Sequence, residues 1–174
     1  MTPSEFSDEQ PQIETDPNEV LAVVQASQGR RILGMGSLLI MGVMLIYIAV
    51  VQSPAFHWRL FLLALGVATL WLGEKMRRAT STRIELTETE LRDGDGTVIA
   101  LIEDIDGMDR GFLAFKPSNG FLLRTTNKAP NEWRPGLWWR FGRRIGIGGM
   151  TSASQTKFMS EIIAAIRAKR EMGL

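Results

Sequence analysis

The chain has 174 residues, a formal net charge of +1, a single histidine and no cysteine. The lack of cysteine excludes disulfides, thiolate catalysis and cysteine-based metal sites, and one histidine alone does not build a metal site. A net charge near zero gives no support to nucleic-acid binding, which depends on neutralising many phosphates. We therefore expect no catalytic residues, no metal, no cofactor and no nucleic-acid partner.

The N-terminal part of the chain is polar and acidic. Residues 1–15 are rich in Ser, Glu, Gln, Pro and Asp, which predicts a disordered acidic tail. Asp16 resembles a helix N-cap, with Pro17 at the first helical position and Glu19 at the third. This pattern predicts an amphipathic helix over 16–29. Its apolar side would be formed by Val20, Leu21, Val23 and Val24.

Residues 32–51 form a long apolar run without any charge. As a helix this run would be about 30 Å long, which matches the hydrocarbon core of a bilayer. A secretory signal peptide is the alternative, but its apolar region is shorter and follows basic residues near the N-terminus. Here the preceding residues are acidic rather than basic. The run therefore predicts a transmembrane helix.

A second apolar run follows, and it is shorter. Its uncharged part, 60–73, spans only about 21 Å as a helix, so a helix lying at the membrane surface is an alternative to a spanning one. Trp58 extends the apolar run, and Arg59 is able to snorkel toward the headgroups. We therefore predict a spanning helix over 56–74, joined to the first by a tight turn around Pro54.

The orientation of this hairpin, residues 30–78, follows from its flanking charges. Basic residues lie at its two outer ends: Arg30, Arg31, Lys75, Arg77 and Arg78. Only Arg59 lies near the connecting turn. Because basic residues stay on the cytoplasmic side, we expect a multi-pass protein of a bacterial inner (plasma) membrane with both termini cytoplasmic.

Small residues on both apolar runs are candidates for helix packing. They are Gly34, Gly42, Ala64 and Ala68. Small side chains allow close approach of helices in lipid, either within the hairpin or between the hairpin and a partner. We therefore expect membrane lipids as partners, together with a membrane-protein partner or self-association through the hairpin. No ionisable residue lies in the middle of either run, so a transport pathway has no support.

The C-terminal part, residues 82–172, alternates short apolar runs with turn signals. Expected strands lie at 82–87, 97–102, 112–115, 121–125, 132–140 and 141–147. Turns are expected at 93–96 and 117–120, which are rich in Gly, Asp, Asn and Pro. The last element, 151–171, is helical, with Ser152 and Gln155 resembling a capping box. Its apolar face comprises Phe158, Met159, Ile162, Ile163 and Ile166.

This order of elements resembles the bacterial pleckstrin-homology-like (PH-like) domains of small membrane proteins. The matching features are a first strand at 82–92, an acidic-apolar segment at 102–105, a late strand at 141–145 and the helix at 151–171. The resemblance implies a small antiparallel β-barrel or sandwich capped by a C-terminal helix, without shared catalytic residues. The expected fold is thus a membrane α-helical hairpin plus a cytoplasmic α+β domain.

Arginines and aromatic residues alternate between positions 124 and 144. The candidate surface for lipid or a partner comprises Trp133, Arg134, Trp138, Arg140, Arg143 and Arg144. Such a surface suits anionic headgroups at the cytoplasmic leaflet. Trp133 and Trp138, beside the Pro135–Gly136 turn, are expected to be exposed. For Trp139 and Phe141, burial in the domain is an equally good interpretation.

Two further patterns have simpler structural explanations. Gly142, Gly146, Gly148 and Gly149 lack the spacing of a phosphate loop and predict a turn with positive φ. Glu103, Asp104, Asp106 and Asp109 depart from the calcium-loop pattern and predict a polar loop. We therefore expect a non-enzymatic binding or scaffolding module, an accessory subunit or assembly factor of a membrane complex. The alternatives are a lipid-headgroup-binding module, or a component of a transporter or membrane enzyme.

Overall fold

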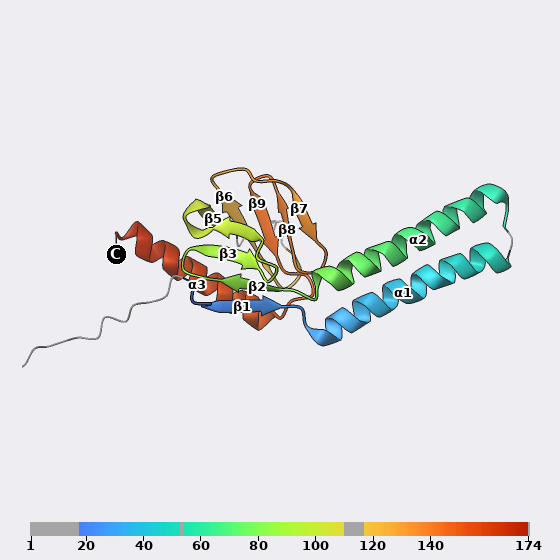
Figure 1. The fold of residues 1–174 in the computed structure, drawn as a ribbon, viewed down its shortest axis with the longest axis horizontal. Helices are drawn as coiled ribbons and strands as arrows, with labels where there is room; N and C mark the ends of the chain where they lie inside the picture. Colours follow the sequence, from blue (N-terminus) through green and yellow to red (C-terminus); the bar gives the residue numbers. More distant parts are fainter. Residues whose placement is uncertain (1–17, 53, 110–116, 174) are drawn as a thin grey trace, which may run out of the picture.

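The computed structural model describes residues 18–52, 54–109 and 117–173. Two antiparallel helices, α1 (Gln28–Val51) and α2 (Phe56–Ala79), extend from one end of a mixed α+β domain (Figure 1). Each has 24 residues and is therefore about 36 Å long. Both predicted apolar segments are thus helical, and α2 is as long as α1. The tail predicted over 1–15 and the strand predicted over 112–115 lie outside the described residues.

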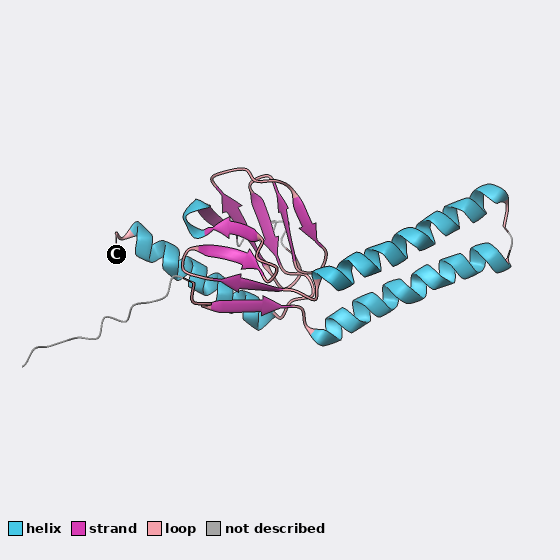
Figure 2. Cartoon of the chain, in the orientation of Figure 1, coloured by secondary structure: helices cyan, strands magenta, loops and turns pink. Residues whose placement is uncertain are grey.

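The domain contains two antiparallel sheets and a C-terminal helix (Figure 2). The first sheet has the order β1 (Ala22–Gln25), β2 (Arg83–Leu86), β3 (Glu90–Asp93) and β4 (Val98–Leu101). The second has the order β5 (Ile105–Asp109), β6 (Phe121–Thr125), β9 (Arg144–Ile147), β8 (Trp138–Phe141) and β7 (Glu132–Arg134). A short 3₁₀ helix, η1 (Ile102–Asp104), connects the sheets, and α3 (Ala153–Glu171) ends the domain. Neither sheet closes on itself within the described residues.

The helix predicted over 16–29 is wrong where the structure describes it. Residues 22–25 form β1, and α1 begins only at Gln28. Strand β1 pairs antiparallel with β2, with Ala22 opposite Leu86. Ala22 and Val24 are buried on the same face of the strand, which is the period-two pattern of a sheet. A favourable pairing partner some sixty positions away therefore outweighs the local apolar pattern that predicted a helix at 22–25.

This correction changes the domain boundaries. Strand β1 directly precedes α1, and β2 directly follows α2, yet the two strands are neighbours in one sheet. The helical hairpin is therefore an insertion in the connection between two paired strands, as Figure 1 shows. The domain predicted over 82–172 gains its edge strand from residues N-terminal to the hairpin.

One hydrophobic core is formed by both sheets and α3. Ile84 and Leu86 of β2 are fully buried, in agreement with the predicted alternation of that strand. Met159 and Ile163 bring the apolar face of α3 into the same core. In Figure 1, α3 runs alongside β1 and covers this side of the first sheet.

Two local predictions in the domain are wrong. The single strand predicted over 141–145 is divided: Phe141 ends β8, residues 142–143 form a turn in which Gly142 takes a positive φ of 61°, and Arg144 begins β9. The capping box does not form, since Ser152 makes no side-chain hydrogen bond to the helix N-terminus. Gln155 instead accepts a hydrogen bond through Oε1 from the backbone N–H of Gln25, at 3.2 Å. That contact satisfies a donor on strand β1, which lies at the edge of its sheet.

Candidate interfacial sites

The two helices of the hairpin contact each other through small residues. A Cβ added to Gly42 would lie 2.6 Å from Leu70 Cδ2 and 3.2 Å from the Gly66 carbonyl oxygen. A Cβ added to Gly66 would lie 2.7 Å from Ile46 Cγ1 and 3.1 Å from the Gly42 carbonyl oxygen. Glycine at both positions therefore permits the closest backbone approach, as expected for helices that pack in lipid.

The other packing candidates occupy different places. Gly34 lies where the hairpin meets the domain, against the side chains of Met76 and Met150. Ala64 and Ala68 are exposed on α2, so their predicted role in packing the two helices together is wrong. Helical residues two positions apart point to different faces of the helix. Gly66 therefore faces α1, whereas Ala64 and Ala68 do not.

The predicted basic-aromatic surface is also wrong as a single surface. Trp138 is only 1% exposed, and its Nε1 donates a hydrogen bond to buried Asp93 at 2.8 Å. Arg140 is 8% exposed and donates to the carbonyl oxygens of Ile99 and Pro130, both at 2.8 Å. Trp138 and Arg140 share one face of β8 because they are two positions apart. Both side chains therefore connect the two sheets and are not available to a ligand.

The remaining members of that set are divided between two ends of the second sheet. Arg143 and Arg144 are exposed at the turn between β8 and β9. Trp133 and Arg134 lie near the opposite end of these strands, beside the Pro135–Gly136 turn. That turn adjoins the end of α2, because a Cβ added to Gly136 would lie 3.1 Å from Cγ2 of Thr80. Only Trp133 and Arg134 therefore approach the hairpin.

A cleft of about 250 Å³ lies between the end of α2 and strand β7. We call it the interfacial cleft; its lining is Lys75, Arg78, Ala79, Glu132, Trp133, Arg134 and Pro135. The Lys75 ammonium lies between two indole rings, 5.1 Å from the centre of Trp71 and 5.0 Å from that of Trp133. This double cation–π contact joins the hairpin to the domain. Lys75 and Trp133 are far apart in the sequence, and no local pattern indicates their meeting.

Ion pairs hold Arg134 in position at the inner wall of the cleft. Its guanidinium contacts Asp95 at 2.7 Å and Glu132 at 3.1 Å. Burial by itself raises the pKa of Asp95, but the hydrogen bond from Thr97 and the charge of Arg134 outweigh it and lower that pKa. Arg134 is therefore a structural arginine that joins β7 to the turn between β3 and β4.

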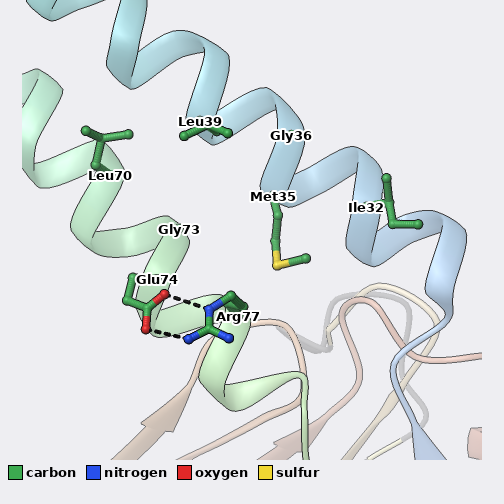
Figure 3. Close-up of a pocket in the computed structure, with 8 residues that line it drawn as sticks. All are labelled: Ile32, Met35, Gly36, Leu39, Leu70, Gly73, Glu74 and Arg77. Atoms are coloured by element: carbon green, nitrogen blue, oxygen red, sulfur yellow. Dashed lines mark hydrogen bonds and ion pairs between the residues drawn. The ribbon is translucent and has the colours of Figure 1, made fainter.

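A second cavity, the hairpin groove, lies between α1 and α2 on the domain side of their contact (Figure 3). It has a volume of about 590 Å³ and is lined by Ile32, Met35, Gly36, Leu39, Leu70, Gly73, Glu74 and Arg77. Its walls are apolar, and Met35 points into it from α1. The Glu74–Arg77 ion pair, with Nε and Oε2 2.7 Å apart, forms its polar end. A Cβ added to Gly36 would meet no atom within 4 Å, so the groove is open at this residue.

The polar loop predicted for the acidic cluster is wrong, because Glu103 and Asp104 lie in η1 and Asp106 lies in β5. Asp106 pairs with Arg124 at 3.0 Å, and Asp104 accepts a hydrogen bond from Asn127 at 2.8 Å. Among the residues that the structure describes, no group of three His, Asp or Glu side chains is arranged to hold a metal ion. No protein-family model matches this chain, and neither a curated protein nor a solved structure matches it.

Proposed function

We propose that this chain is a non-enzymatic inner-membrane protein of bacteria whose PH-like cytoplasmic domain is a binding and scaffolding module. In this role it serves a membrane complex as an accessory subunit or assembly factor. The observation that carries the proposal is the insertion of the hairpin between the paired strands β1 and β2. A domain connected at both strands is held in one orientation against the membrane, which is what a scaffold requires.

The membrane assignment is supported by what the hairpin exposes. Only 11% of the most apolar 18-residue stretch of each helix is buried, whereas a core helix of a soluble protein is mostly buried. Large apolar side chains point outward, among them Leu33 at 76% and Phe56 at 81% exposure. Each such side chain gains about 1.5–3 kcal/mol when it leaves water. Two helices with this surface are stable in lipid and prone to aggregate in water.

Contacts at the membrane end of the domain support a fixed orientation. The backbone N–H of Ser27 donates to the Met150 carbonyl at 2.7 Å, immediately before α1. The Arg30 guanidinium donates to the hydroxyl of Ser118 at 3.3 Å. On the other helix, Lys75 contacts Trp133 of the domain. Both helices are therefore bound to the domain, independently of the peptide bonds that connect them.

The hairpin groove is the docking place that we assign to the partner. In a spanning hairpin, the groove opens toward the acyl chains of the cytoplasmic leaflet. Gly36 and Gly73 contribute no side chain to its otherwise apolar lining, which suits the close approach of an apolar transmembrane helix. A transmembrane helix of a partner protein is therefore the occupant that this groove fits best.

Substitution at Gly36 tests the proposal. Gly36→Leu should fill the groove without disturbing the hairpin, because nothing lies within 4 Å of the added Cβ. Gly29→Leu is the matched control, since it makes the same change in the same helix and also in open space. We expect the tagged full chain, purified in mild detergent, to retain a stoichiometric membrane protein that Gly36→Leu loses and Gly29→Leu keeps.

The alternative outcomes of this experiment are distinct. A complex that contains only this chain would identify a second copy as the occupant, and Gly36→Leu should then be monomeric. A transporter or enzyme in the complex would define the process that the scaffold serves. Equal retention by both variants would contradict docking in the groove.

Orientation is tested separately by labelling of single cysteines, since the chain has no native cysteine. Lys169→Cys in α3 should react with an impermeant thiol reagent only after the inner membrane is opened. Ala55→Cys in the turn of the hairpin should react in intact spheroplasts. The reverse pattern would contradict a cytoplasmic domain.

A further inference from the structure

The interfacial cleft lies at the depth of lipid headgroups if the hairpin spans the membrane as proposed. Lys75 follows Phe56 by nineteen positions, or about 29 Å along the helix axis. This length equals the thickness of the hydrocarbon core, about 30 Å. Lys75 therefore lies at the cytoplasmic boundary when Phe56 lies at the other. Trp71, one helical turn before Lys75, is in the region where indole rings collect in membrane proteins.

Two cations of the cleft are available to an anion. Among the described residues, Lys75 forms no ion pair, and its two indole contacts leave the ammonium N–H donors free of carboxylates. The Arg78 side chain is 77% exposed and pairs with Glu74 through Nε alone, at 2.7 Å. Because Glu74 also binds Arg77, its single negative charge is shared between two arginines.

The carboxylate that lines the cleft does not oppose an anion there. Glu132 contacts Arg134 at 3.1 Å and Arg140 at 3.6 Å, so two guanidinium groups balance its charge. Counting Lys75, Arg78 and Arg134 against Glu132, the lining has a net charge of +2, and Asp95, which pairs with Arg134, reduces it to +1. The field in the cleft is therefore positive even though one wall is acidic.

The indole of Trp133 adds an apolar wall to this cationic cleft. The side chain of Trp133 is 42% exposed. An exposed indole beside a cation suits a ligand that has a phosphate at one end and acyl chains at the other. Free inorganic phosphate would use the cations but not the indole.

We infer that the interfacial cleft binds the headgroup phosphate of an anionic phospholipid from the cytoplasmic leaflet. Lys75 and Arg78 contact the phosphate, and Trp133 packs beside the glycerol and the first part of the acyl chains. The bound lipid fills the space between α2 and β7 and strengthens the junction of hairpin and domain. The hairpin groove is a separate cavity with different lining residues, so lipid binding in the interfacial cleft does not depend on what docks in the groove.

Native mass spectrometry of the delipidated full chain in detergent tests this site. We expect dioctanoyl phosphatidylglycerol to bind more tightly than dioctanoyl phosphatidylcholine, and inorganic phosphate not to compete at the same concentration. The variant Lys75→Gln/Arg78→Gln should bind phosphatidylglycerol about thirtyfold more weakly, because each cation near the surface contributes about a factor of five.

The matched control is Arg143→Gln/Arg144→Gln, which removes the same charge at the exposed turn between β8 and β9. It should bind phosphatidylglycerol as the wild type does. An equal loss in both double variants would overturn the proposal, because it would indicate diffuse attraction to a basic protein. Competition by inorganic phosphate would overturn the lipid as the source of the anion.

The single variant Arg78→Gln tests the same site in case the double variant does not fold. Its highly exposed side chain contributes little to packing, so the variant should keep the thermal midpoint of the wild type and lose about fivefold in affinity. Unchanged affinity in this variant and in the double variant would overturn the site. Cysteine labelling reports orientation independently, so failure of this site and failure of the membrane assignment give different results.

Discussion

The hairpin and the domain bury opposite kinds of residue. In the hairpin, the buried positions are small, with Gly42 and Ala49 on α1 and Gly66 and Thr69 on α2. In the domain, the largest fully buried side chains are Trp138, Ile84, Leu86, Leu91, Ile99, Ile102, Leu123, Leu137, Ile145, Ile147, Met159 and Ile163. Large apolar side chains therefore point inward in one region and outward in the other.

If the hairpin spans a membrane as proposed, this difference reflects the solvent around each region. In water, burying large apolar side chains is the dominant driving force of folding, so the domain places them in its core. In lipid, the acyl chains are as apolar as leucine, so helices associate through close packing of small residues. The boundary lies at the end of α2, where Lys75 and Arg78 face the domain. The predictions below test each side of this boundary.

The largest effect is expected from the domain core. Trp138→Ala removes a buried indole and leaves the Asp93 carboxylate without its donor, which should cost about 3–5 kcal/mol. Trp133→Ala, at an exposed position, should cost less than about 1 kcal/mol. Urea unfolding of the detergent-solubilised full chain, followed by circular dichroism, measures both. Similar costs for the two variants would contradict the division of this segment into core and surface.

A smaller effect is expected from the connection between the sheets. Arg140→Met should cost about 2–3 kcal/mol, because it leaves the carbonyl oxygens of Ile99 and Pro130 without a charged donor. Arg143→Met, in the exposed turn, should leave the urea midpoint within error of the wild type. If Arg143→Met is the more damaging substitution, the placement of these arginines is wrong.

The stability of the contact between α1 and α2 should depend on where a side chain is added to α1. Gly42→Leu places side-chain atoms against Leu70 and the Gly66 backbone, and should destabilise the helix contact by about 1–3 kcal/mol. Gly36→Leu, in open space, should leave that contact intact. The thermal midpoint of the full chain in detergent compares the two. Equal tolerance of both substitutions would mean that α1 and α2 do not meet at Gly42.

The smallest effect is expected from pH, through Glu85 of β2. Burial by itself raises the pKa of Glu85, but its hydrogen bonds with Arg92 and Arg83 outweigh it and lower that pKa. Because the folded pKa lies below the ordinary value of 4.5, this stabilisation is complete above pH 4.5. It is lost as the pH falls through the folded value. Glu85→Gln should reduce the acid dependence of the urea midpoint, and an unchanged dependence would exclude this contribution.

Local patterns were sufficient for the elements whose character is set by their own residues. The uncharged runs predict α1 and α2, because length and lack of charge alone determine whether a helix fits a bilayer. The run 121–125 coincides with β6, and the spacing of Met159 and Ile163 predicts the buried face of α3. In each case the periodicity and the burial agree within a single segment.

Tertiary structure alone decided which short segments pair and which faces they bury. Residues 22–25 become a strand because β2 offers an unpaired edge from across the hairpin, and the five-residue apolar stretch 20–24 carries no information about that edge. Trp138 is buried and Trp133 exposed because alternate positions face opposite sides, and only the packing of the two sheets selects the inner side. Lys75 and Trp133 meet for the same reason, since contacts between distant segments are set by the fold and not by either segment's own sequence.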